Sequence, residues 1–130
     1  MRFHYSDSGK PLLPITLSLG EKSLAVDALL DSGADVNVLP WRVGVSLGAQ
    51  WNERKTTLRL AGALAGTDAM PLLMASRVAG FQPVRLAFAW CRTDDVPLVL
   101  GQTNFFMEFD ICFFRARHEF SVLPKGSGNA

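Results

Sequence analysis

Cysteine and histidine are scarce in this sequence, which has two of each among 130 residues. Cys91 and Cys112 lie far apart, each among apolar neighbours, so both are expected to be reduced thiols of the core. No pair of these residues has the two-to-four-residue spacing of zinc sites, and neither cysteine has a histidine close in sequence. The sequence therefore predicts no bound metal, no cofactor and no thiol protease.

Long apolar runs and blocks of one charge are also missing. The longest apolar region, residues 58–75, is interrupted by Arg59, Asp68 and Pro71, so it cannot span a bilayer. The first residues contain no apolar segment typical of a secretory signal, which leads us to expect a cytoplasmic protein. The formal net charge is +1 with no basic block, so neither nucleic acid nor a membrane surface is an expected partner.

The composition is that of a globular chain, with 48% hydrophobic and 19% charged residues. A length of 130 residues suits one domain with one core. We expect that domain over residues 11–124, between a flexible lead-in at 1–10 and a flexible tail at 125–130.

Short stretches of alternating apolar and polar residues, bounded by glycine and proline, predict a mainly β protein. A helix is expected over 104–109, with Thr103 as its N-cap. Residues 41–47 fit a helical turn or an irregular segment, because Gly44 and Gly48 lower helix propensity. The prediction is a closed, barrel-like β fold with one short C-terminal helix. The expected strands are 11–19, 23–30, 37–39, 58–60, 70–74, 84–90, 98–100, 111–114 and 120–123.

One polar turn stands out among these strands. The strand over 23–30 leads directly into Asp31, Ser32 and Gly33, which are typical turn residues. Such a turn is usually structural, but Val36, Val38 and Leu39 resume an apolar pattern at once and are expected to lead the chain straight back into the core. An acid at a buried corner needs a reason, because burying an unpaired charge is costly. We therefore expect backbone N–H groups to hold the Asp31 carboxylate.

Residues 27–39, which contain Asp31-Ser32-Gly33-Ala34, resemble the active-site segment of the retropepsin-like aspartic proteases. A second landmark of that family is an aliphatic run, a glycine and a helix. Residues 98–106, with Gly101 at their centre, resemble it in the expected order and at about the expected distance. The two landmarks together are much more specific than either alone.

The resemblance implies an acid-protease lobe and an aspartic endopeptidase that hydrolyses peptide bonds. One chain carries one Asp-Ser-Gly, so the two carboxylates of the reaction would come from a homodimer. The substrate would be a polypeptide held in an extended conformation. The resemblance assigns catalysis to Asp31, the active-site loop to Ser32 and Gly33, and substrate binding to Ala34, Asp35 and the flap residues Gly62, Ala63 and Gly66.

The sequence departs from the retroviral pattern at two places. Gln102 occupies the position of an arginine that pairs with the residue equivalent to Asp35, so we expect at most a hydrogen bond between Gln102 and Asp35. Residues 109–123 form a longer C-terminal hairpin, which predicts a different dimer interface. The alternative hypothesis is a retropepsin-fold module for peptide binding or dimerisation, with weak or no catalysis.

Overall fold

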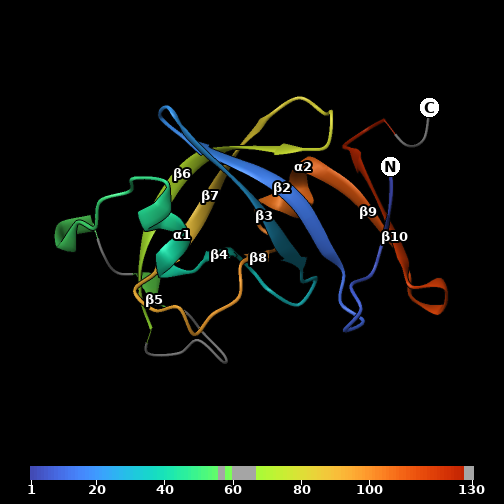
Figure 1. Cartoon of the computed structure of the whole chain (residues 1–130), viewed down its shortest axis with the longest axis horizontal. Helices are drawn as coiled ribbons and strands as arrows, with labels where there is room; N and C mark the ends of the chain where they lie inside the picture. The colour runs from blue at the N-terminus through green and yellow to red at the C-terminus, as the bar shows by residue number, and fades with distance from the viewer. Residues whose placement is uncertain (56–57, 60–66, 128–130) are drawn as a thin grey trace.

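This computed structural model describes residues 1–55, 58–59 and 67–127. With 49% strand and 13% helix it is mainly β, as predicted (Figure 1). The strands are β1 (Arg2–His4), β2 (Leu12–Leu19), β3 (Lys22–Leu30), β4 (Asn37–Leu39), β5 (Leu58–Arg59), β6 (Asp68–Val78), β7 (Val84–Cys91), β8 (Val99–Leu100), β9 (Phe109–Phe114) and β10 (Glu119–Pro124).

The larger sheet has the strand order β2-β3-β8-β4-β7-β6-β5, and β2 also pairs with β6. Because β6 pairs with β2, the six strands β2, β3, β8, β4, β7 and β6 form a closed ring of paired strands. Leu13, Ile15 and Leu17 of β2 point inward and are at most 3% exposed, as their alternation with polar residues predicts. The barrel-like arrangement therefore encloses the main core.

The smaller sheet has the order β1-β10-β9, and both outer pairings are antiparallel. Residues 1–10 are predicted to be a flexible lead-in, but the structure places Arg2–His4 in a strand paired with β10. Phe3 explains the difference, because its ring stacks on Phe120 with the centroids 5.3 Å apart. Two or three alternating residues are too short a pattern to predict such a strand from sequence.

The predicted flexible tail also differs in its first residues. The backbone N–H of Lys125 donates to the carbonyl oxygen of Glu108 at 3.0 Å, and their side chains form a 3.4 Å ion pair. The N–H of Gly126 donates to the carboxylate of Asp110 at 3.3 Å. The chain after β10 is thus attached to β9 and the helix before it, and residues 128–130 lie outside the described part.

The described residues contain two α-helices, α1 (Trp41–Ser46) and α2 (Phe105–Glu108), rather than the single C-terminal helix predicted. Two 3₁₀ turns accompany them, η1 (Glu53–Lys55) and η3 (Arg115–Arg117). Gly44, which weakens the helix prediction, has a packing role in α1. A Cβ atom at this position would lie 2.3 Å from the indole of Trp90. Tertiary packing therefore overrides the low helix propensity of this glycine.

Three tryptophans form the packed centre next to α1. The Trp41 and Trp90 rings stack with centroids 4.6 Å apart, and Trp51 meets both edge-on at 5.6 Å. The guanidinium of Arg92 lies 5.3 Å from the Trp51 ring and pairs with Glu53 at 2.6 Å. This cluster attaches the chain before β5 to the end of β7.

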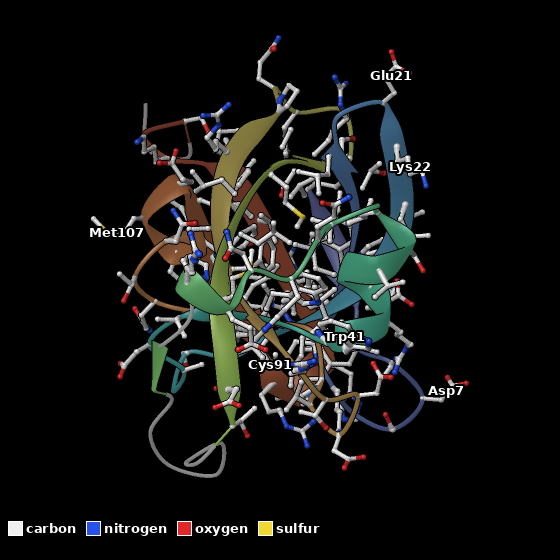
Figure 2. The ribbon with its side chains drawn as sticks, turned by 90° about the vertical axis from the view of Figure 1, so that its left-hand side faces the viewer. Asp7, Glu21, Lys22, Trp41, Cys91 and Met107 are labelled. Carbon is white, nitrogen blue, oxygen red and sulfur yellow. The ribbon has the colours of Figure 1, made fainter. Side chains whose placement is uncertain are left out.

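The two cysteines are in different environments. Cys91 is buried at the end of β7 (Figure 2), and burial raises the pKa of its thiol to about 11. Cys112 is exposed, so the prediction of two core thiols is wrong for this residue. Its place in β9 explains the exposure, because Cys112 pairs with Ser121 on the face of the small sheet that does not contact the core.

These environments predict one reactive thiol in the folded protein. At pH 8 an aromatic disulfide reagent that releases a coloured thiolate should modify one cysteine per chain, because the thiolate of Cys91 is both inaccessible and disfavoured. Denaturant should release a second equivalent. Cys112→Ser should abolish the reaction of the native protein, and rapid labelling that remains in this variant would contradict the assignment.

Gly44→Ala is expected to lower the free energy of unfolding by about 1–3 kcal/mol, because the added methyl group overlaps the Trp90 ring. Urea denaturation followed by tryptophan fluorescence measures the change. Gly80→Ala is the matched control, since among the described residues no atom beyond its chain neighbours lies within 4 Å of the place that its Cβ would take. Equal stability of the two variants would show that α1 accommodates the methyl group.

Candidate active site

The carboxylate of Asp31 is held at the point where β3 ends. The N–H of Gly33 donates to its Oδ1 at 2.9 Å, and the N–H of Ala34 donates to its carbonyl oxygen at 3.1 Å. The N–H of Asp31 itself donates to the carbonyl oxygen of Leu100 at 3.1 Å. One backbone N–H group therefore holds the carboxylate, where several are predicted, and the corner, expected to be buried, is only half-buried at Asp31. Ser32 and Gly33 are exposed at the tip of the turn.

The two landmarks of the sequence meet in the fold. β8 lies between β3 and β4, parallel to β3 through Leu29↔Val99 and antiparallel to β4 through Val38↔Val99. A Cβ atom on Gly101 would lie 2.6 Å from the carbonyl oxygen of Val36, so this position accepts only glycine without movement of the backbone. The close approach fixes the segment after Asp31 against the segment before α2.

Hydrogen bonds continue this contact beyond Gly101. The N–H groups of Gln102 and Thr103 donate to the carbonyl oxygens of Ala34 and Asp35 at 2.9 and 2.8 Å. The side-chain amide of Gln102 donates to the carbonyl oxygen of Ser32 at 2.8 Å. Among the described residues, the predicted contact of this amide with the Asp35 carboxylate is therefore replaced by a contact with the turn after Asp31.

Sequence reasoning missed a pair of hydrogen-bonded amides beneath the corner, one buried and one half-buried. Asn37 is fully buried, and its Oδ1 accepts from the N–H of Gly101 at 2.8 Å. Its Nδ2 donates to the carbonyl oxygen of Ala87 at 3.0 Å and to Oδ1 of Asn104 at 3.1 Å. The same Asn104 oxygen accepts from the N–H of Ala87 at 2.7 Å. An asparagine inside the apolar run 36–39 was the available signal.

This pair also changes the interpretation of α2. The structure places Asn104, not the predicted Thr103, at the N-cap position, and its side chain makes no capping hydrogen bond. The Asn104 side chain instead serves β7 and Asn37. The start of α2 is therefore set by contacts with the sheet. Its interior is fixed by Phe105, whose ring stacks on Phe109 at 4.8 Å.

The predicted substrate-binding residues fall into two groups. Ala34 is half-buried and Asp35 is exposed, and both follow Asp31 directly at the corner. Gly62, Ala63 and Gly66 lie outside the described residues, so their role stays a prediction. Val36, which follows Asp35 and is expected in the core, is instead an apolar side chain on the surface at 38% exposure.

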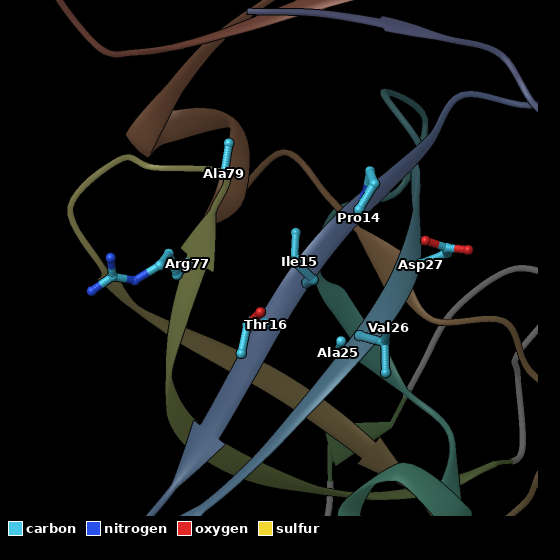
Figure 3. Close-up of a pocket in the computed structure, with 8 residues that line it drawn as sticks. All are labelled: Pro14, Ile15, Thr16, Ala25, Val26, Asp27, Arg77 and Ala79. Carbon is cyan, nitrogen blue, oxygen red and sulfur yellow. The ribbon is translucent and has the colours of Figure 1, made fainter.

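A hollow of about 330 Å³ lies elsewhere, on the outer face of β2, β3 and β6 (Figure 3). Figure 3 shows that the charged ends of Asp27 and Arg77 point away from each other. The hollow therefore does not gather polar groups around one point, as small-molecule sites do. Its lining residues are Pro14, Ile15, Thr16, Ala25, Val26, Asp27, Arg77 and Ala79.

Residues 1–55, 58–59 and 67–127 contain neither a metal-binding cluster nor a membrane-spanning helix. No three histidine, cysteine, aspartate or glutamate side chains gather there as a metal site requires. No helix in that part of the chain has the length and apolar character needed to cross a bilayer.

Comparison with known proteins identifies the fold. No protein-family model matches the sequence, and no curated protein matches it. Among solved structures, a retropepsin-like aspartic protease from Rickettsia conorii aligns with a TM-score of 0.68. That alignment covers 95% of this chain and 97% of the other at 13% identity. The chain has the retropepsin-like fold.

A second solved structure supports the same assignment. The retroviral protease-like domain of Ddi1 from Leishmania major aligns with a TM-score of 0.58 and 16% identity. The alignment covers 91% of this chain and 97% of that domain. At these identities the proteins share a fold, and the predicted resemblance to the retropepsin-like lobe is confirmed at that level.

The amide pair beneath the corner yields a test by two matched substitutions. Asn37→Asp removes the donor to Ala87 and Asn104 and places a charge in the interior, so we expect a loss of at least about 2 kcal/mol of unfolding free energy. Asn104→Asp keeps both acceptor contacts at a half-buried site, and its expected loss is below about 1 kcal/mol. Chemical denaturation at pH 7 measures both. A larger loss of stability for Asn104→Asp than for Asn37→Asp would contradict the assigned donor and acceptor roles.

Proposed function

We propose that this chain is an aspartic endopeptidase that acts as a homodimer, with Asp31 of each protomer supplying one catalytic carboxylate. The observation that supports the proposal is the Asp31 corner. A carboxylate is fixed by the N–H of Gly33 at an exposed turn of a retropepsin-like fold. A side chain held in this way is oriented before substrate arrives, which is what acid–base catalysis requires.

The proposed reaction needs two carboxylates that share one site. Two carboxylates a few ångströms apart cannot both be ionised, so the pair holds a single proton. The ionised member takes a proton from water, whose oxygen attacks the peptide carbonyl carbon. The protonated member donates to the carbonyl oxygen, which gives a tetrahedral diol. Collapse of the diol breaks the C–N bond as the leaving nitrogen is protonated.

The need for a pair makes dimerisation part of the chemistry. One chain provides one Asp-Ser-Gly turn, and a two-fold axis beside that turn would bring Asp31 next to its own copy. Ser32 and Gly33 are exposed at the tip of the turn, so they are available to meet the partner. In this arrangement Ser32 forms hydrogen bonds across the axis and holds the two turns together.

The substrate proposed is a polypeptide in an extended conformation that lies across the Asp31 pair. The carbonyl oxygens of Ala34 and Asp35 each already accept a hydrogen bond, from Gln102 and Thr103. Each carbonyl oxygen keeps a second lone pair for substrate. The exposed side chain of Asp35 and the apolar surface of Ala34 and Val36 offer further contacts at this corner.

The alternative is a peptide-binding or dimerisation module without appreciable catalysis. The observation that favours it is the contact of Gln102 with Ser32, a neutral hydrogen bond where retroviral relatives carry an ion pair. Neutral hydrogen bonds are weaker than charge-assisted ones, so this corner is less firmly braced. A cleavage assay separates the two functions.

Asp31→Asn is expected to reduce cleavage of an unstructured protein or a peptide library by about 10³-fold or more, since it removes both proton-transfer groups of the pair. The assay runs from pH 4 to pH 7, with products read by mass spectrometry. Asp27→Asn is the matched control, because Asp27 is an exposed aspartate on β3, the strand that leads to Asp31, four residues earlier. It should leave the rate unchanged.

Sedimentation accompanies the cleavage assay. Cleavage that persists in Asp31→Asn excludes Asp31 as the catalyst. A strictly monomeric but active protein excludes the paired mechanism. A dimer that cleaves nothing in either form supports the binding-module alternative.

A further inference from the structure

The tip of the β9–β10 hairpin lies at the lower right of Figure 1. Arginine side chains gather around it. Arg115 and Arg117 belong to η3, and His118 follows them. Arg2 lies on β1, which pairs with β10 of the same hairpin. All four side chains are exposed, so the guanidinium charges of the three arginines face solvent.

Two aromatic rings support the guanidinium groups. Phe114 has the Cζ atoms of Arg2 and Arg117 at 4.3 and 4.7 Å from its ring centroid. Tyr5 has the Cζ atom of Arg115 at 5.5 Å from its own centroid. A guanidinium that stacks on a ring keeps its N–H groups at the edge, where they can still donate. We name Arg2, Tyr5, Phe114, Arg115, Arg117 and His118 the hairpin-tip cluster.

The cluster retains an excess of positive charge. Arg2 is neutralised by Glu119, whose Oε1 lies 2.9 Å away. Within the described part of the chain, neither Arg115 nor Arg117 has a carboxylate oxygen within 4.0 Å. Arg115 instead contacts Nε2 of His118 at 3.3 Å. This concentration contrasts with the formal net charge of +1 for the whole chain.

The backbone at the tip is also well constrained. His118 adopts a left-handed conformation with φ of 53°, and its N–H donates to the carbonyl oxygen of Arg115 at 3.1 Å. The N–H of Tyr5 donates to the carbonyl oxygen of His118 at 2.8 Å. The backbone bonds hold the loop, and the stacked rings hold the arginine side chains. The arginines would therefore lose little side-chain entropy when a ligand binds.

We propose that the hairpin-tip cluster binds an acidic segment of a polypeptide, with carboxylates meeting Arg115 and Arg117. The guanidinium fork matches a carboxylate in two parallel hydrogen bonds. The two arginines lie over different rings, so they offer separate contacts to two acidic side chains of an extended peptide. Nucleic acid fits less well, since its affinity comes from neutralising many phosphates along a longer basic stripe. This inference does not depend on catalysis by Asp31.

The test is fluorescence anisotropy with a labelled eight-residue glutamate-rich peptide and its glutamine counterpart. The protein is the full chain carrying Asp31→Asn, so the probe cannot be cleaved by the proposed site. We expect saturable binding of the glutamate peptide that weakens from about 0.05 to about 0.5 M salt, as screening predicts. The double variant Arg115→Gln/Arg117→Gln should weaken it about tenfold or more.

Arg77→Gln/Arg85→Gln is the matched control, because it removes the same charge from exposed positions on β6 and β7. Thermal melts of both double variants report folding. The proposal is overturned if the glutamine peptide binds equally well, if both double variants lose affinity equally, or if the wild-type cluster binds no acidic peptide. Preferential binding of a single-stranded RNA probe overturns it in favour of nucleic acid. A sedimentation coefficient that changes only in the Arg115/Arg117 variant overturns it in favour of a second copy of this chain.

Discussion

The buried amide of Asn37 is the contact on which the candidate site depends. It accepts from the N–H of Gly101 and donates to the carbonyl oxygen of Ala87, so one side chain joins the segment after Asp31 to β7 and to the start of α2. Gly101 is buried, so its N–H would lack a partner in the interior without Asn37, which costs far more than an exposed hydrogen bond contributes. The corner cannot shift without breaking several such bonds.

Steric contact and hydrogen bonding act together at this point. Gly101 lets the two chain segments approach within a distance that any side chain would prevent, and the N–H groups after it bind the carbonyl oxygens of Ala34 and Asp35. The backbone of Asp31 is consequently positioned by the paired strands, and the turn adds one hydrogen bond to its carboxylate, from the N–H of Gly33. Functional groups built on regular elements are held more accurately than groups on free loops. The geometry of the corner is thus a property of the sheet.

The terminal sheet gives the molecule its second distinct surface. β1 pairs with β10 of the same chain, so in the proposed dimer each protomer arrives with its terminal strands already paired. The open edges of this sheet differ, because β1 is short and charged whereas β9 has six residues, most of them apolar. The charged hairpin tip joins β9 to β10 at one end of this sheet. Catalysis and peptide recognition are in this way proposed for separate parts of one small fold.

Much of this architecture could be read from residue patterns. Alternating residues predict strands over 11–19 and 23–30, close to the observed Leu12–Leu19 and Lys22–Leu30, because the period of two is local. Asp31-Ser32-Gly33 predicts a turn because its residue types favour one. The exposure of Cys112, the helix over Trp41–Ser46 and the strand Arg2–His4 were not predictable in this way. The helix and the strand are decided by partners distant in sequence, Trp90 and Phe120, and the exposure of Cys112 is decided by which face of the small sheet packs on the core. The local chain thus specifies the acid and its turn, whereas the pairing of Gln102 with Ser32 and of Asn37 with Gly101 arises only when segments more than 60 residues apart are packed together.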